Sequence, residues 1–326
     1  MQGKVTPNRS AKTKVYAGID VCKDWLDVHI ASTGEELRVE NKPKGFRKLA
    51  RWLAAAAVER VVMEPTGKYH RSASRHLHDN GFGVCIVDPM RARLFAQSTG
   101  RLAKTDRLDA RMLALMGTIY DVDATPPTSV LLEQMQEILR ARQSAVDDRT
   151  ALSNQLGESK TKVVCQQLKR RMRRLDDDKA KLEAELDRLI ASDPVIARRC
   201  AIADSITGIG PVAAAWLAIG VPELGSCANK EAAMLVGLAP VACDSGDQRG
   251  KRKIRGGRAD VRRGIYMAAT SAANHNPTLK PFYDRLIAAG KAYKVAITAV
   301  MRKLVTLANT LIKEDRLWQP TAPKIA

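Results

Sequence analysis

The chain of 326 residues has few acidic side chains for its size and few aromatic rings. It contains 35 Asp and Glu against 54 Lys and Arg, a formal net charge of +19. An excess of this size indicates a polyanionic partner, and nucleic acid is the commonest soluble polyanion. Aromatic residues make up 4% of the chain, which argues against extensive stacking of bases on aromatic platforms. We therefore expect contacts to nucleic-acid backbone and shape.

Two further absences bear on the cell compartment. No stretch approaches 18 uninterrupted apolar residues, so we expect no membrane span. The basic N-terminus, MQGKVTPNRSAKTK, lacks the apolar core of a signal peptide. The six cysteines include no C-x-x-C pair, which disfavours a zinc site and a disulfide framework. We expect a prokaryotic cytoplasmic protein associated with the nucleoid, with a basic disordered arm over residues 1–14 and no membrane partner.

Residues 15–125 alternate between strand and helix patterns. Short apolar runs predict strands near 15–20, 25–32, 37–41, 60–65 and 82–89. Helical spacing of apolar residues predicts helices near 44–57, 69–81 and 107–120. The first two runs suggest a hairpin, because the second shows partial alternation and is followed by a turn signal at Gly34. We expect an α/β domain that begins antiparallel and continues with βα units.

The segment 130–192 is dense in charge and contains no proline and one glycine, Gly157. Its second half has an apolar seam with one lysine fault, formed by Leu168, Met172, Leu175, Lys179, Leu182, Leu186 and Leu189. These residues step by four and three, as a heptad repeat does. A long helix packed within its own chain, a helical hairpin and a dimeric coiled coil all fit this pattern. We expect a coiled coil or helical hairpin, with a dimer or tetramer formed through it.

The last part, 195–320, is rich in helix patterns separated by glycine turns. The stretch SITGIGPVAAAWLAIG, residues 205–220, has the form of a helix-hairpin-helix turn. Gly208 and Gly210 permit a tight turn, and Pro211 is suited to begin the next helix. The free N–H groups of that helix would then face a phosphate. A plain corner between two helices is the alternative.

Four acids occupy the ends of predicted elements in the first domain. Asp20 closes the first strand, Glu64 closes the strand before Pro65, and Asp106 and Asp109 lie one helical turn apart. Four carboxylates at one place repel each other unless a cation neutralises them. Mg²⁺ prefers oxygen ligands, and two such ions can clamp the attacking and leaving oxygens of a phosphodiester. Taken singly, each acid is more often an ordinary surface residue.

Basic residues gather in three places that we expect to contact nucleic acid. One group flanks the paired aspartates, one lies on the seam helix, and one follows Ser245. They are Lys104, Arg107 and Arg111; Lys169, Arg170, Arg171, Arg173 and Arg174; and Arg249, Lys251, Arg252, Lys253, Arg255, Arg258, Arg262 and Arg263. Charge runs are usually solvated faces, but the glycines within the third group permit close backbone approach.

Six stretches in order carry a family resemblance: GIDVCKDWLDV (18–28), MEPTGKY (63–69), KTDRLDARMLA (104–114), GIGPVAAAWL (208–217), GLAPVACDSG (237–246) and RRGIYMAA (262–269). Together they resemble the DEDD transposases of insertion sequences, the group that includes Piv-type DNA invertases and bridge-RNA-guided recombinases. The resemblance runs from about residue 15 to 315. It implies a RuvC-like (RNase H) fold at 15–125 whose tetrad Asp20, Glu64, Asp106 and Asp109 binds Mg²⁺.

The resemblance also implies a mostly helical C-terminal transposase domain with a serine that becomes linked to DNA. Ser245 matches that serine, and it is the only serine between residues 228 and 270. A hydroxyl needs a base or a metal ion for activation, which the family supplies from carboxylates of another protomer. Tyr266 is the competing hydroxyl. The resemblance further implies DNA as substrate and a structured guide RNA as partner.

Three other functions fit parts of the pattern. A junction-resolving endonuclease would share the acidic fold but would not use the serine or the second domain. A sugar-kinase or actin-like ATPase also begins with GID at a first-strand end, but it then needs a phosphate-binding turn, and this chain continues VCKDWLDV. A non-catalytic nucleic-acid-binding protein would leave the four acids without a use.

Overall fold

The computed structural model describes residues 14–99, 106–242, 250 and 252–320, except for the side chains of Asp106 and Arg107. The chain divides into two units, residues 1–128 and 129–326. Among these described residues, two hydrophobic clusters belong to unit 1 and one large cluster belongs to unit 2.

Unit 1 contains a five-stranded mixed sheet in the order β3-β2-β1-β4-β5. The strands are β1 (Tyr16–Val21), β2 (Trp25–Ile30), β3 (Glu36–Glu40), β4 (Arg60–Met63) and β5 (Gly83–Ile86). β1, β2 and β3 pair antiparallel, whereas β4 pairs parallel with both β1 and β5. The predicted α/β domain with an antiparallel start and later βα units is therefore confirmed.

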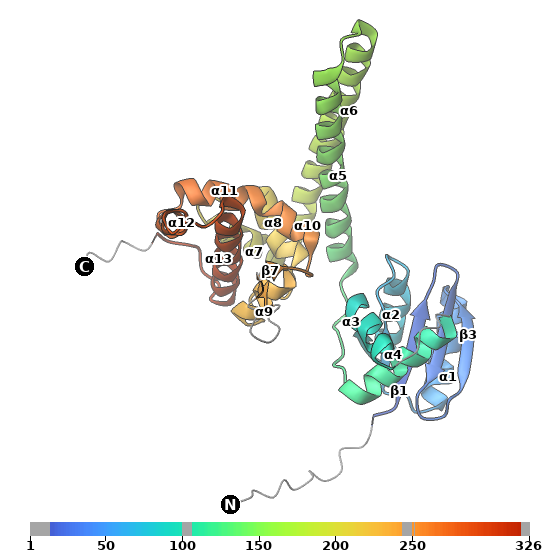
Figure 1. Cartoon of the computed structure of the whole chain (residues 1–326). Coiled ribbons are helices and arrows are strands. Elements are labelled where there is room, and N and C mark those ends of the chain that lie inside the picture. The colour runs from blue at the N-terminus through green and yellow to red at the C-terminus, as the bar shows by residue number, and fades with distance from the viewer. Residues whose placement is uncertain (1–13, 100–105, 243–249, 251, 321–326) are drawn as a thin grey trace, which may run out of the picture. The chain divides into compact units, whose positions relative to one another are not determined.

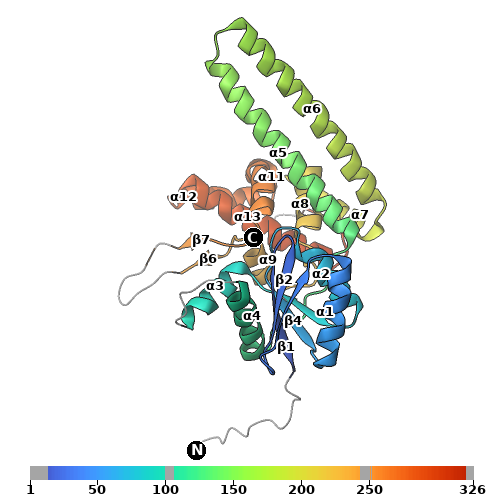
Figure 2. The ribbon, with the colours of Figure 1, turned by 90° about the vertical axis from the view of Figure 1, so that its right-hand side faces the viewer.

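Helices cover both faces of this sheet (Figure 2). The helices of unit 1 are α1 (Pro43–Ala55), α2 (His70–Asp79), α3 (Pro89–Ser98) and α4 (Asp106–Tyr120). Leu49 and Leu53 of α1 and Leu77 of α2 pack with Ile19 on one face. Residues of α3 and α4 form the second cluster on the opposite face with Tyr16 and Val62, namely Phe95, Met112, Leu113 and Met116. Burial on two faces explains why β1 and β4 read as continuous apolar runs in the sequence.

Two long helices begin unit 2, α5 (Val130–Glu158) and α6 (Lys162–Ala191), and they lie side by side as an antiparallel pair (Figures 1 and 2). The apolar seam of α6 is its least exposed side, with Leu168, Leu186 and Leu189 buried. The middle of the pair is polar, because ion pairs join Arg142 to Glu183 at 2.7 Å and Arg149 to Asp176 at 2.6 Å. The seam therefore lies against the α5 helix of the same chain.

The other described elements of unit 2 are helices and one small hairpin. Its elements are α7 (Pro194–Asp204), α8 (Pro211–Gly220), α9 (Asn229–Leu235), β6 (Pro240–Val241), β7 (Lys253–Ile254), α10 (Ala259–Gly264), α11 (Tyr266–His275), α12 (Leu279–Ala288) and α13 (Tyr293–Lys313). They surround one core that includes Trp216 of α8 and Leu304 of α13. The first residue of α8 is Pro211, as the turn pattern predicts.

α13 is the one described helix that is long and apolar enough to cross a membrane by length and composition alone. Half of its most apolar stretch is buried inside the protein. Val300, Leu304, Ala308 and Leu311 are fully buried in the core of unit 2. Core packing thus accounts for its apolar face.

Candidate active site

Asp20 and Glu64 lie at the same end of two neighbouring parallel strands. The pairing of β1 with β4 sets Ile19 opposite Met63, so the next residue of each strand reaches the carboxyl edge of the sheet together. Both side chains are half-buried. Ligand sites of α/β sheets usually form at this edge. The register therefore brings together two of the four predicted acids.

α4 carries the second acidic pair to the same edge, because it runs antiparallel to β1 and touches it closely. A Cβ added at Gly117 would lie 2.5 Å from the ring of Tyr16, at the start of β1. One added at Gly18 would lie 2.0 Å from the carbonyl oxygen of Ala110. The late turns of α4 thus lie beside the start of β1, and the early turns lie towards its end. Asp109, which precedes Ala110, lies near the carboxyl edge.

Alternation along the strands places both strand acids on the face that α4 covers. Tyr16 and Val62 belong to the cluster beneath α4, and side chains two or four residues further along a strand share its face. Asp20 follows Tyr16 by four residues, and Glu64 follows Val62 by two. The strand acids and the helix that carries Asp109 therefore share one face of the sheet.

The donor chemistry at this edge suits a divalent cation, since carboxylate oxygens are the ligands that Mg²⁺ prefers. Among the side chains that the structure describes, however, no three His, Cys, Asp or Glu residues form a group that could hold a metal ion. Asp106 begins α4, and its side chain lies outside the described part. The fold therefore brings the backbone positions of the acids to one edge of the sheet, but the described side chains do not form a complete set of metal ligands.

Asp27 on β2 is a fifth carboxylate in this region, and sequence reasoning missed it. The antiparallel register pairs Asp27 with Asp20, so the two residues share a face of the sheet. Asp27 is 3% exposed, and Arg38 on β3 donates to both of its oxygens at 2.8 Å, from Nε and Nη2. The signal for it was an aspartate inside the apolar run WLDVHI, because an ionised residue is rarely buried without a partner.

A cavity of about 440 Å³ lies further along β2 on the same side, lined in part by His29, Glu36, Thr99 and Arg111. Burial lowers the pKa of His29, and Glu36, whose carboxylate lies 3.6 Å from Nδ1, opposes that shift. Arg111, a predicted nucleic-acid contact, is exposed at the rim. Lys104, from the same predicted group, lies outside the described residues, as does the side chain of Arg107.

Ser245, the predicted nucleophile, also lies outside the described residues, with Arg249 and Lys251. In the sequence it stands between β6 and β7, which pair antiparallel with Pro240 opposite Ile254 and Val241 opposite Lys253. The structure therefore describes the two strands on either side of the serine segment.

The described basic residues that follow Ser245 fall into two groups. Arg252, Lys253 and Arg255 are exposed. Three others are hydrogen-bonded inside unit 2: Arg258, Arg262 and Arg263. Arg263, for example, donates to Asp147 of α5 at 2.6 Å. The second group is thus engaged with acceptors within unit 2, whether its side chains are half-buried, as in Arg258 and Arg262, or exposed, as in Arg263.

The other predicted contacts are placed as follows. On α6 the five basic residues are all exposed: Lys169, Arg170, Arg171, Arg173 and Arg174. Gly208 has a φ of 104°, and a Cβ there would lie 2.6 Å from Ala272 of α11, whereas a Cβ at Gly210 would meet nothing within 4 Å. Gly208 is thus required by packing between helices, and Gly210 leaves the start of α8 open.

Tyr266, the competing hydroxyl, begins α11 and is hydrogen-bonded to Tyr293 of α13. This hydrogen bond, together with desolvation, raises the pKa of Tyr266. A raised pKa disfavours the phenolate, which is the nucleophilic form. These interactions therefore favour the neutral hydroxyl of Tyr266.

Two family matches cover most of the chain. Residues 17–159 match a transposase family of the DEDD IS110 type, and residues 200–284 match the transposase family IS116/IS110/IS902. The first match covers most of unit 1 and continues through α5, and the second covers most of the helical part of unit 2. The chain belongs to the DEDD transposases of insertion sequences, which confirms the resemblance seen in its motifs, and it is an enzyme of DNA rearrangement.

Individual relatives agree with this assignment. The chain is 26% identical over 318 residues to the pilin gene-inverting protein of Moraxella bovis. The matched region covers 93% of this chain and 97% of that protein. The pilin gene-inverting protein of Moraxella lacunata matches to the same extent. An uncharacterized 43.6 kDa protein of insertion element IS110 from Streptomyces coelicolor is 24% identical over 181 residues, 55% of this chain and 43% of that protein.

Proposed function

We propose that this transposase cuts and rejoins DNA at specific sites through an acidic metal site on a RuvC-like unit 1 and a serine nucleophile on unit 2. The observation that carries the proposal is the convergence of β1, β4 and the start of α4, which places Asp20, Glu64 and Asp109 at one edge of the sheet.

Asp20, Glu64, Asp106 and Asp109 would hold the divalent ions, two Mg²⁺ in this proposal. When bound, such ions lower the charge of the phosphodiester and activate an oxygen nucleophile. The carboxylates would supply the ligand oxygens. Because β1, β4 and α4 are held by core packing, the backbone positions that carry these carboxylates are fixed. Arg111 at the adjacent rim would attract the phosphate backbone.

In the proposed cleavage, Ser245 Oγ attacks the phosphorus of a phosphodiester and its proton passes to a base. The bond from phosphorus to the leaving sugar oxygen breaks, and that oxygen takes up a proton. The product is a serine–DNA phosphoester. A hydroxyl of a second DNA end then attacks this phosphoester and releases the serine. The number of phosphoester bonds is unchanged, so no external energy source is needed.

Further features belong to the same proposal. A structured guide RNA would occupy some of the exposed basic residues, such as the group on α6. A dimer or tetramer would bring the acids of one protomer to the serine of another. Because the α6 seam lies against α5 of the same chain, such an assembly would use other faces of the helix pair. We place the protein in the prokaryotic cytoplasm, at the nucleoid.

Trapping a protein–DNA adduct and mapping the linked residue tests the nucleophile. We expect the adduct at Ser245, lost in Ser245→Ala and kept in Ser153→Ala, which changes an exposed serine on α5. An adduct that persists in Ser245→Ala would refute the serine. Free DNA ends without any adduct would favour hydrolysis by a junction-resolving endonuclease.

Titration with Mn²⁺, followed by calorimetry, tests the acids without relying on turnover. Asp20→Asn should abolish binding, because it removes a central oxygen ligand. Asp24→Asn, which alters an exposed acid four residues away, should bind like the parent protein. Undiminished recombination in excess chelator would contradict the metal site.

A further inference from the structure

We propose that Glu223 and Arg258 are positioning residues that hold the base of the β6–β7 hairpin, whose two strands flank a segment of the sequence needed for the reaction. This inference rests on the proposed function, because that segment contains Ser245. It also gives Arg258 a role different from the phosphate contact that its place in a basic run predicts.

The two side chains form a bidentate ion pair. Arg258 Nη1 and Nη2 donate to the two carboxylate oxygens of Glu223 at 2.6 and 2.5 Å. The side chains are 37% and 39% exposed. Burial alone would raise the pKa of Glu223, but the hydrogen bonds from Arg258 and its charge hold that pKa below the ordinary value. A parallel two-bond geometry fixes direction as well as distance, so the pair locates the start of α10.

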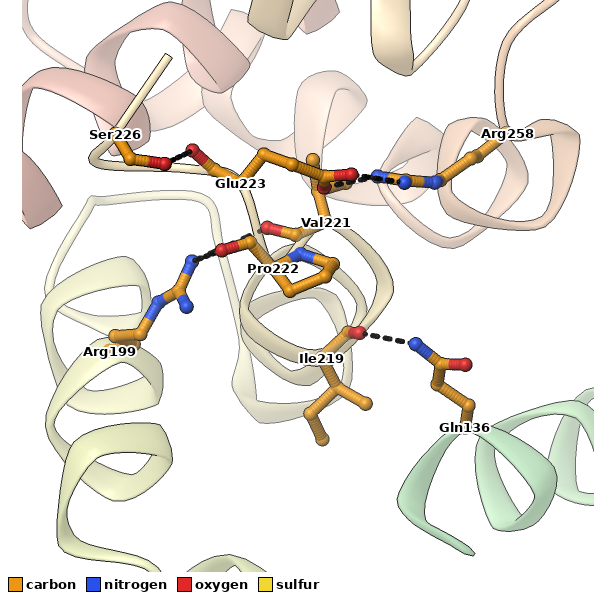
Figure 3. Close-up of polar contacts among 8 residues, drawn as sticks. All are labelled: Gln136, Arg199, Ile219, Val221, Pro222, Glu223, Ser226 and Arg258. Atoms are coloured by element: carbon orange, nitrogen blue, oxygen red, sulfur yellow. Dashed lines mark hydrogen bonds and ion pairs between the residues drawn. The ribbon is translucent and has the colours of Figure 1, made fainter. Parts of the chain in front are cut away.

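Glu223 is in turn held by the helices around it. It lies in the connection between α8 and α9. Arg199 Nη2 donates to the carbonyl oxygens of Val221 and Pro222 at 3.3 and 3.0 Å (Figure 3). It also donates to Leu224 O at 2.9 Å. Asn309 of α13, 2% exposed, accepts a hydrogen bond from Gly225 N at 2.7 Å. Buried polar side chains that bind a loop in this way make it rigid.

The hairpin leaves the domain next to this anchor. Arg258 N donates to Leu235 O at 2.8 Å, and Arg262 Nη1 donates to Val236 O and Gly256 O at 3.0 and 2.9 Å. The backbones before β6 and after β7 are also in close contact, since a Cβ added at Gly257 would lie 2.2 Å from Gly237 N. The backbones at the two ends of the hairpin are therefore in contact, and Arg258, which forms the ion pair with Glu223, lies at this contact.

The pair differs from the neighbouring cations in a way that makes the inference testable. Arg252 and Arg255 are exposed, whereas the guanidinium of Arg258 already has a carboxylate on both of its terminal nitrogens. If Arg258 contacted a DNA phosphate, replacing Glu223 would free its guanidinium, and DNA affinity would stay the same or increase. If Arg258 instead positions the hairpin, replacing Arg258 or Glu223 should slow adduct formation equally.

The experiment compares Glu223→Gln, Arg258→Gln and the double variant in the full chain, with Arg255→Gln as the matched control. Three quantities are measured: the rate of adduct formation, DNA affinity against salt concentration, and amide hydrogen exchange of the β6 and β7 strands without DNA. We expect both single variants to slow adduct formation by the same factor, roughly tenfold to a hundredfold. The double variant should be no slower, because the two residues act as one unit.

DNA affinity and its salt slope should be unchanged in Glu223→Gln and Arg258→Gln, while exchange in the strands becomes faster. Arg255→Gln should do the reverse, reducing the salt slope by about one with exchange unchanged. Exchanging the partners, with Glu223→Arg and Arg258→Glu together, should restore part of the adduct rate and slow the exchange again. Thermal melting tests whether each variant is folded. Arg258→Lys, which keeps the positive charge but cannot form the two-bond contact with Glu223, replaces a variant that does not fold.

Two results would overturn the positioning role. One is a salt slope that falls in Arg258→Gln while Glu223→Gln binds as well as the parent protein or better. The other is unchanged amide exchange in both single variants. Absence of any adduct in the parent protein would count against the proposed serine chemistry instead, and the exchange data would still decide whether the pair holds the hairpin.

Discussion

The Asp27–Arg38 pair changes the charge expected at the edge of the sheet. Asp27 lies in register with Asp20, so an unpaired carboxylate there would add to the repulsion among the acids. The guanidinium of Arg38 binds both oxygens of Asp27 and cancels its charge. The edge therefore carries the negative charge of the predicted tetrad without that of a fifth acid.

Arg38→Gln tests this pairing. Because it leaves the buried Asp27 without its cation, we expect the free energy of unfolding to fall by roughly 1–3 kcal/mol, measured by urea denaturation. Adding Asp27→Asn should restore part of the loss, since a neutral amide is less costly to bury. Arg91→Gln, at an exposed position of α3, is the control and should change stability by no more than about 0.5 kcal/mol. An Arg38 variant as stable as this control would contradict the account.

His29 makes stability depend on pH. Its pKa is lowered in the folded protein by burial, against the opposing effect of Glu36, so below about pH 6.5 the unfolded chain binds a proton that the folded chain does not. Stability should therefore be complete above that pH and fall as the pH drops through it. Denaturation at about pH 7.5 and about pH 5.5 should show a smaller difference in His29→Gln than in the parent protein. His78→Gln, at an exposed site, should retain the parent difference.

At the scale of elements, close contacts between backbones decide where the acids meet. Gly18 and Gly117 let α4 lie directly on β1, and Tyr16 Oη donates to Asp121 just beyond the end of α4. The helix is thus attached to the strand along its length. In unit 2 the α6 seam is matched by α5 rather than by a second chain, with the ion pairs Arg142–Glu183 and Arg149–Asp176 where the apolar pattern is interrupted.

Gly18→Ala should displace α4 from the sheet. The added methyl group would lie 2.0 Å from Ala110 O and 2.4 Å from Ala114 N, and overpacking of this kind costs roughly 1–3 kcal/mol. We expect a lower free energy of unfolding and weaker Mn²⁺ binding. Gly157→Ala, in a helix with open space around it, should be neutral or slightly stabilising. Parent-like metal binding in Gly18→Ala would show that the contact does not position Asp109.

At the scale of the whole molecule, the chain consists of two units with separate cores. The clusters of unit 1 contain residues from Val15 to Val122, and the cluster of unit 2 begins at Leu131. The segment after α4 remains attached to unit 1, because Thr125 N donates to Val84 O at 2.7 Å. The division of labour in the proposed reaction, with metal on one unit and nucleophile on the other, therefore follows a physical boundary.

A fragment of residues 14–128 should fold alone, because its clusters need nothing from unit 2. We expect cooperative unfolding by circular dichroism, Mn²⁺ binding that Asp20→Asn abolishes, and no DNA adduct. A fragment of residues 14–108 is the control: it lacks nearly all of α4, so the cluster beneath that helix is uncovered and cooperative unfolding should be lost. An unfolded 14–128 fragment would show that the units depend on each other.

Local patterns were enough to predict the mixed sheet of unit 1, the helical unit 2, Pro211 at the start of α8 and the family. They also predicted four acids at element ends. These features depend on apolar periodicity, on turn residues and on motif order, all of which are properties of short stretches.

Other features were decided only by tertiary structure, because they depend on residues distant in the chain. Asp27 lies beside Asp20 through strand register, and Arg38 neutralises it from another strand. Arg258 resembles its basic neighbours in sequence but binds Glu223, which lies 35 residues away. The apolar seam of α6 fits a partner helix of either the same or another chain, and only the fold places α5 against it. A charge pattern shows that a cation is present, whereas its role depends on which acid or phosphate the fold brings to it.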